Sequence, residues 1–398
     1  MVPVGLKGVR MREYLVLLLV SAAVTYLLTG PLRAWLFAQG IVPAIRARDV
    51  HSVPTPKLGG VAMFAGLCAG LLTATHFTRV GRVFADTSDV KALLSGAALI
   101  WVLGVVDDRW ELDSLLKLGG QVLAAAVMVF QGLKILWVPI PGVGVVALGP
   151  LESTLLTVFV IVMTINAVNT IDGVDGLANG VVLIASLAFF LYAYRLWFGY
   201  GIQGAAPAAL IAAVLTGVCA GFLPHNLPPA RIFMGDSGAL LIGLVLSVPS
   251  ISLAGQVDPE FIAAQVSSHA AAGYKLAPFY LPLLLPVVMI GVPVFDMGFA
   301  IVRRAATGKH PFRADRGHLH HRLRDRGHGD VWTVAVVYLL SAALCCGVVA
   351  LSVQSARHSW LLIAMGVLLA AAGLVLAAPR MIAFVRRTPR TAETEGAA

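Results

Sequence analysis

Long apolar stretches alternate with short polar segments along the whole chain. A membrane-spanning helix needs about 20 predominantly apolar residues. By that criterion the pattern predicts ten to eleven spans, centred on residues 13–38, 58–75, 91–106, 119–135, 153–168, 178–197, 205–223, 238–254, 278–300, 331–352 and 359–378. We therefore expect an all-α, polytopic helical bundle. It forms one integral membrane domain over residues 1–385, followed by a polar, disordered tail over residues 386–398.

The composition strengthens this prediction and excludes a soluble enzyme. The chain is 59% hydrophobic and only 12% charged, whereas a soluble protein carries about twice that charged fraction. Its formal net charge of +9 fits basic loops that face the cytoplasm and anionic lipid better than it fits a nucleic-acid-binding protein.

Basic residues gather in alternate loops between the predicted spans, and loops of this kind face the cytoplasm. They include the segments 46–60 and 303–326 and the single residues Arg109, Lys117 and Arg231. This bias places the N-terminus outside. Every polar cluster with candidate chemistry falls in the same set of loops, so we expect one active site at the cytoplasmic surface of the membrane.

Two of these clusters are acidic. Asp107 and Asp108 are adjacent at the end of a predicted span, and Asp172 and Asp175 lie in NTIDGVDGLANG between two further spans. Neighbouring carboxylates repel one another unless a proton or a cation lies between them. A Mg²⁺ ion bridged to substrate phosphates would relieve that repulsion. The alternative is a pair of hydrated loops with solvated acids.

A third cluster, GFLPHNLPPARIFMGDSG over residues 221–238, is a proline-rich loop that opens the next span. Asp236 is placed either to cap that helix or to hold a metal near a phosphate at the helix N-terminus. Phe233 is suited to stacking on a planar base or to anchoring at the membrane interface. Asn226 is suited to a ligand contact or to a turn.

The remaining clusters are basic. Lys57 follows a run of basic residues in segment 46–60, and the segment HPFRADRGHLHHRLRDR over residues 310–326 mixes histidines with arginines. Such a patch suits an anionic substrate, with Arg313 and Arg316 as phosphate clamps, better than it suits zinc. Positive-inside anchoring alone also accounts for segment 46–60. Acidic side chains that suit Mg²⁺ and basic side chains that suit phosphate lie on one predicted face of the membrane. This combination favours phosphoryl transfer between a soluble nucleotide and a lipid.

Four motifs together resemble a known family. VDD at Val106, NTIDGVDGLA at Asn169, PARIFMGDSG at Pro229 and DRGHLHHRL at Asp315 are similar in order and spacing to those of the polyprenyl-phosphate N-acetylhexosamine-1-phosphate transferases, glycosyltransferase family 4. The resemblance spans about residues 40–330. It implies a bacterial inner-membrane phosphotransferase that uses Mg²⁺, with Mn²⁺ as a substitute. Undecaprenyl or decaprenyl phosphate would attack a UDP-N-acetylhexosamine to give a polyprenyl-diphospho-sugar and UMP, the first membrane step of cell-envelope polysaccharide synthesis.

The same resemblance distributes roles over the motifs. It implies a metal ligand at Asp236 and paired acids at Asp107 and Asp108, which act on the metal or on the lipid phosphate. It also implies a nucleotide-side motif at Asn169, Asp172 and Asp175, uridine-pocket positions at Asn226 and Phe233, a phosphate contact at Lys117, and sugar or diphosphate contacts at His318, His320 and His321.

The interrupted pattern HLHH, with Leu319 between the histidines and Arg316 before them, resembles the branch that uses UDP-GlcNAc. The branch that makes lipid I from UDP-MurNAc-pentapeptide has three consecutive histidines and remains the alternative substrate reading. A lipid or solute transporter is the alternative from another class, but it would place ionisable residues at mid-membrane depth. The sequence does not determine the lipid length, the downstream polymer or whether the chain forms a homodimer. It also leaves open whether the lipid phosphate attacks directly or through a covalent aspartyl intermediate.

Overall fold

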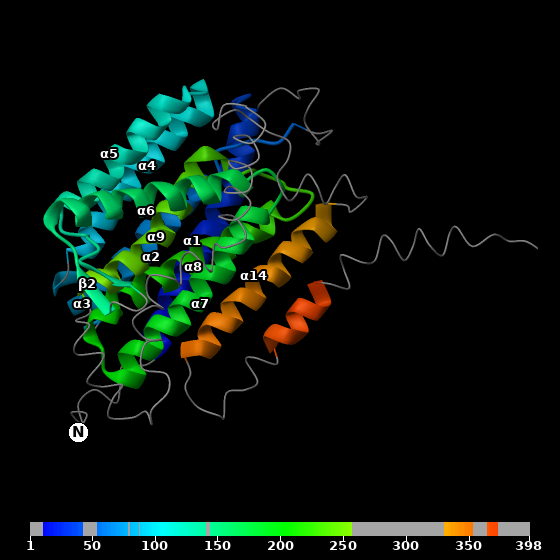
Figure 1. Cartoon of the computed structure of the whole chain (residues 1–398). Coiled ribbons are helices and arrows are strands. Elements are labelled where there is room, and N and C mark those ends of the chain that lie inside the picture. The colour runs from blue at the N-terminus through cyan, green and yellow to red at the C-terminus, as the bar shows by residue number, and fades with distance from the viewer. Residues whose placement is uncertain are drawn as a thin grey trace, which may run out of the picture.

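The computed structural model describes residues 11–42, 54–78, 80–86, 88–140, 144–256, 330–352 and 364–372. Within these ranges the chain is almost entirely helical (Figure 1). The elements are α1 (Met11–Ala38), α2 (Gly60–Thr75), α3 (Val80–Asp86), α4 (Asp89–Trp110), α5 (Ser114–Phe130), β1 (Trp137–Ile140), β2 (Gly144–Ala147), α6 (Pro150–Ile171), α7 (Leu177–Tyr200), the 3-10 turn η2 (Gln203–Ala205), α8 (Ala206–Asn226), α9 (Gly235–Gln256) and α14 (Asp330–Ser352).

Six of the described helices are long and apolar enough to cross a membrane: α1, α4, α6, α7, α8 and α9. Three more apolar helical segments are shorter: α2, α5 and the part Val331–Gly347 of α14. All nine coincide with predicted spans, so the polytopic all-α architecture is confirmed. The predicted span 278–300 lies outside the described residues, and of span 359–378 only residues 364–372 are described, as helix.

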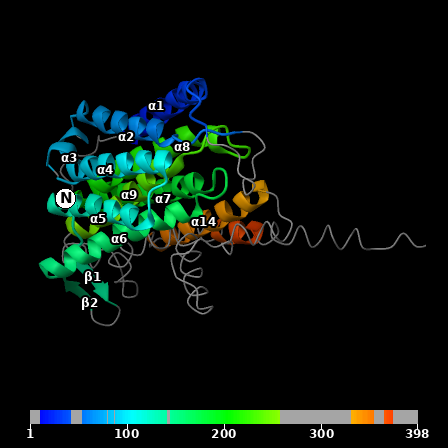
Figure 2. The same cartoon turned by 90° about the horizontal axis from the view of Figure 1, so that it is seen from above.

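The bundle is organised around α8 and α9, the two most deeply buried of the candidate spans. Helices α1 and α7 pack on α8, while α4 and α6 pack on α9. Helix α5 covers α4 and α6, and α14 packs on α7 at the opposite edge of the bundle (Figures 1 and 2). Helices that come earlier in the chain therefore surround the central pair α8 and α9.

Three helices, α2, α4 and α9, approach one another closely at the first turn of α9. A Cβ atom at Gly104 of α4 would overlap the backbone of Ser237, and one at Gly60 of α2 would overlap Ser237 and Gly238. Small residues at such crossings allow membrane helices to pack backbone to backbone. The polar residues at the ends of α4 and α2 are thereby fixed against the N-terminus of α9.

The sequence pattern did not predict a hairpin between α5 and α6. Strands β1 and β2 pair antiparallel, with Trp137 opposite Ala147 and Ile140 opposite Gly144. Each strand has four residues, which is too short for a clear alternation of apolar and polar positions. The short helix α3 was also not predicted. Both lie away from the helix ends that carry the acidic clusters.

Candidate active site

The last turn of α4 is locked by its own backbone and by Asp107. Glu111 follows the helix in the left-handed conformation, with φ of 49°, and its N–H group donates to the carbonyl of Asp107 over 2.9 Å. The N–H group of Leu112 donates to Asp107 Oδ1 over 2.8 Å. One oxygen of the Asp107 carboxylate therefore orients the chain as it turns from α4 into α5, and the other remains for the site.

Asp108 caps the N-terminus of α9. Its Oδ1 accepts from the N–H group of Asp236 over 2.8 Å, and its Oδ2 accepts from that of Ser237 over 3.0 Å. A carboxylate is favoured there because the first N–H groups of a helix have no partner within the helix and the dipole is positive at that end. Gly235 adopts φ of +67°, and a Cβ there would lie 2.5 Å from both Asp108 oxygens. The adjacent acids thus have different partners.

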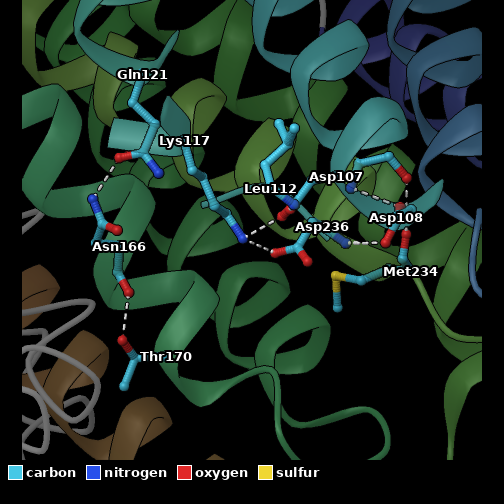
Figure 3. A network of polar contacts seen from close by, with 10 residues as sticks. Asp107, Asp108, Leu112, Lys117, Gln121, Asn166, Thr170, Met234 and Asp236 are labelled. Atoms are coloured by element: carbon cyan, nitrogen blue, oxygen red, sulfur yellow. Dashed lines mark hydrogen bonds and ion pairs between the residues drawn. The ribbon is translucent and has the colours of Figure 1, made fainter. Parts of the chain in front are cut away.

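Lys117 joins Asp107 to Asp236. Its Nζ lies 2.6 Å from Asp107 Oδ2 and also pairs with Asp236 Oδ1, and Figure 3 shows the lysine reaching between the two carboxylates. The Asp107 side chain is 6% exposed and that of Asp236 is 32% exposed. The cluster is therefore open to solvent on the Asp236 side.

Helix α5 presents Lys117 to this cluster. Asp113 caps the helix through a hydrogen bond from the N–H group of Leu115 over 2.9 Å, which sets Lys117 one turn further on. Gln121 follows after another turn, almost fully buried, and its Oε1 accepts from Asn166 Nδ2 of α6 over 2.6 Å (Figure 3). This amide pair holds α5 against α6, the helix that leads into the acidic loop.

Gln121 was not among the residues predicted from the sequence. Its signal was available: a lone amide between apolar residues, four positions after a lysine, lies on the same helix face as that lysine. Polar side chains inside membrane helices usually face the protein interior and meet a partner.

The acidic loop between α6 and α7 faces the same helix ends. Asp175 Oδ2 accepts from the N–H group of Ala230 over 2.8 Å, which ties the acidic loop to the proline-rich loop before α9. Burial is the main reason that the pKa of Asp172 is raised to about 8, from an ordinary value of 3.8. The negative charges of three nearby carboxylates, Asp236, Asp108 and Asp175, raise this pKa further, while Lys57 opposes them. The acids of separate motifs therefore share one electrostatic environment.

This raised pKa predicts how stability changes with pH. Between about pH 4 and about pH 8 the folded protein holds a proton on Asp172 that the unfolded chain has released, so stability falls as the pH rises through that window. We expect Asp172→Asn to raise the Tm in detergent near pH 8 and to flatten the dependence of Tm on pH. The matched control is Asp113→Asn, at the exposed cap of α5. Equal Tm values for Asp172→Asn and wild type near pH 8 would contradict the assignment.

The remaining predicted contacts have diverse surroundings. Asn226 is 2% exposed; its Oδ1 accepts from the N–H group of Gly176 and its Nδ2 donates to the carbonyl of Ile232, each over 3.1 Å. It braces two loops. Asn169 is partly exposed near the end of α6.

Phe233 is partly exposed and lies beside the segment that carries Lys57. Its N–H group donates to the carbonyl of Pro56, and its carbonyl accepts from the N–H group of Gly59, both over 2.9 Å. Lys57 is exposed on this segment. The structure thus brings together predicted residues from three of the four motifs, together with Lys57 and Lys117. Arg313, Arg316, His318, His320 and His321 lie outside the described residues.

The donor set suits one hard cation. Within the described part of the chain, no three His, Cys, Asp or Glu side chains gather to hold a metal ion. Two carboxylates, Asp107 and Asp236, nonetheless converge on a single positive group, the Lys117 ammonium. Mg²⁺ is commonly held by one or two carboxylates together with water and substrate phosphates. The residues present therefore fit Mg²⁺.

Comparisons with known proteins point in one direction. A family model described as glycosyl transferase family 4 matches residues 90–254. The decaprenyl-phosphate N-acetylglucosaminephosphotransferase of Mycobacterium tuberculosis is 39% identical over 335 residues, which cover 83% of this chain and 81% of the relative. A probable undecaprenyl-phosphate N-acetylglucosaminyl 1-phosphate transferase of Bacillus subtilis is 30% identical, with 83% of each chain covered. A phospho-N-acetylmuramoyl-pentapeptide-transferase of Desulforudis audaxviator is 32% identical over 58% of this chain and 75% of the relative.

Proposed function

The chain belongs to glycosyl transferase family 4, the polyprenyl-phosphate N-acetylhexosamine-1-phosphate transferases, and from that membership we propose that it transfers N-acetylglucosamine 1-phosphate from UDP-GlcNAc to a polyprenyl phosphate. The products are polyprenyl-diphospho-GlcNAc and UMP. Relatives named for N-acetylglucosamine align over 83% of this chain, whereas the pentapeptide transferases align over 58% or 68%. The structural observation that carries the proposal is the Asp107–Lys117–Asp236 cluster at the meeting point of α4, α5 and α9.

The reaction is a displacement at phosphorus. An oxygen of the lipid phosphate forms a bond to the β-phosphorus of UDP-GlcNAc, and the bond from that phosphorus to the oxygen bridging to the α-phosphate breaks. UMP leaves with the electron pair on its phosphate. A phosphate monoester has a second pKa of about 6, so the lipid phosphate is largely dianionic at neutral pH and needs no general base. Positioning and charge neutralisation then supply most of the rate enhancement.

The residues of the cluster divide this work. Asp107 and Asp236 would hold Mg²⁺, which when bound neutralises phosphate charge and polarises the reacting phosphorus. Lys117 offers a second positive charge to phosphate oxygens at the same place. Lys57 and Phe233, which neighbouring backbone contacts place together, are available to the nucleotide. We assign this end of the bundle to the cytoplasm, because UDP-sugars are cytoplasmic and the basic loops favour that orientation.

The test is UMP release by purified protein with undecaprenyl or decaprenyl phosphate and Mg²⁺, with UDP-GlcNAc and UDP-MurNAc-pentapeptide offered in separate reactions. We expect release with UDP-GlcNAc only, and none after a chelator removes the metal. Release with the pentapeptide substrate alone would keep the chemistry and overturn the sugar assignment. Transport of lipid into liposomes without UMP release would overturn the enzymatic proposal.

A further inference from the structure

Both backbone polar groups of one residue in the acidic loop, Gly176, are held by side chains from two other helices. The N–H group of Gly176 donates to Asn226 Oδ1 of α8 over 3.1 Å. The carbonyl of Gly176 accepts from the hydroxyl of Tyr338 on α14, in addition to the N–H group of Gly180 at 2.9 Å. Gly176 has φ of +74° and precedes the first residue of α7, so these bonds fix the turn at which the loop becomes a helix.

The surface of α7 is shaped to receive Tyr338. A Cβ atom at Gly180, one helical turn after Gly176, would overlap the hydroxyl and the ring of Tyr338. Helices α14 and α7 lie side by side in both views (Figures 1 and 2). The absence of a side chain at Gly180 therefore lets the tyrosine reach the carbonyl that it binds.

The acids of the loop depend on that turn. Asp175 immediately precedes Gly176 and accepts from Ala230 of the next loop over 2.8 Å. Asp172 lies four residues before Gly176, where the charges of Asp236 and Asp108 act on it. A change at the Gly176 peptide would move both carboxylates relative to the Lys117 cluster. Tyr338 is separated from Gly176 by 162 positions in the sequence and lies beyond residues 90–254, the segment that the family model matches.

We propose that Tyr338 is a positioning residue for the acidic loop, and that α14 sets the affinity for the nucleotide-sugar through its hydrogen bond to Gly176. The inference rests on the proposed function, in which this loop serves the UDP-sugar. It adds a contribution from a helix that carries none of the recognised motifs. The lipid phosphate, which meets the enzyme at the Lys117 cluster, should be affected much less.

Tyr338→Phe tests the hydrogen bond while keeping the ring. We expect KM for UDP-GlcNAc to rise about 3- to 10-fold, the change that one lost hydrogen bond produces, with kcat and KM for polyprenyl phosphate nearly unchanged. Tyr14→Phe is the matched control, because the Tyr14 hydroxyl is buried and has no hydrogen-bond partner among the described residues. Gly180→Ala, which displaces the ring but keeps the hydroxyl, should produce the same selective rise in KM.

A second measurement separates this inference from the proposed function. Amide hydrogen exchange over residues 169–180 should be faster in Tyr338→Phe than in wild type and unchanged in Tyr14→Phe, whether or not UMP is released. Tyr338→Phe with wild-type exchange and wild-type KM for UDP-GlcNAc would overturn the positioning role. Equal rises in KM for both substrates would also overturn it, because they would indicate a general structural defect. A wild-type protein that fails to release UMP would refute the proposed function, and the exchange data would still decide the role of Tyr338.

Discussion

Replacing Asp236 with asparagine is expected to reduce UMP release by about 10³-fold, the upper range for removing one electrostatic contact from a transition state. Asp236 supplies the more exposed of the two carboxylates that converge on Lys117, and an amide removes the charge that a metal ion needs. The protein should still insert and fold, because the backbone N–H group of Asp236, not its side chain, binds Asp108. UMP release in single-turnover reactions and Mn²⁺ binding followed by electron paramagnetic resonance measure the two effects.

The control for this variant is Asp113→Asn, close to the cluster in sequence and equally conservative. Asp113 caps α5, and asparagine is as good a cap as aspartate, so activity and metal binding should match wild type. Full activity in Asp236→Asn would refute the metal role. Lost activity with unchanged Mn²⁺ binding would move the metal away from this side chain.

Lys117→Ala should produce the second-largest loss, about 10²- to 10³-fold in UMP release. Without the ammonium group, Asp107 and Asp236 face each other with no positive charge between them and repel, and the phosphates lose a cationic partner. The same change should tighten Mn²⁺ binding, because the ammonium group occupies the place between the two carboxylates that a metal ion would take. Activity and Mn²⁺ affinity should therefore change in opposite directions.

Two further variants serve as comparisons for Lys117→Ala. Lys117→Arg keeps the charge but replaces a compact ammonium group with a planar fork, and we expect activity between those of wild type and Lys117→Ala. Lys91→Ala removes an exposed lysine near the start of α4, far along that helix from Asp107, and should change neither activity nor Mn²⁺ binding. Weaker Mn²⁺ binding in Lys117→Ala would contradict competition between lysine and metal.

The helices and the grouping of the acids could be predicted from the sequence, because both follow from local patterns. Apolar runs of membrane length predicted nine of the described helices. The placement of Asp107, Asp172 and Asp236 at helix ends indicated one shared face, and the structure brings these acids into one environment.

The different roles of Asp107 and Asp108 could not be predicted. Successive residues of a helix point about 100° apart, so one side chain faces α5 and the other faces α9. Whether Asp107 or Asp108 faces α5 depends on how α4 is rotated about its axis relative to its neighbours. Close packing at Gly104 sets that rotation. This rotation of α4 cannot be predicted from the sequence alone.

The contacts of Asn226 and Tyr338 also could not be predicted from the sequence. An amide in a loop of candidate ligands suits a ligand contact or a turn equally well, and Asn226 holds backbone groups of two loops. A tyrosine in an apolar helix is usually interpreted as a packing residue, yet the Tyr338 hydroxyl donates a hydrogen bond to a loop carbonyl. Both residues form hydrogen bonds to separate segments of the chain, and the periodicity of apolar and polar residues does not indicate such partners.

The carboxylate of Asp108 at the start of α9 has a consequence for inhibitors. The N-terminus of a helix is a common binding place for phosphate, but here a protein carboxylate already takes the N–H groups of Asp236 and Ser237. A diphosphate mimic that relies on a helix terminus would have to displace it. A compound that carries its own cation in place of the metal, or that pairs directly with Lys117, avoids this competition. Molecules selected against nucleotide-binding loops of the helix-terminus type should therefore bind this enzyme poorly.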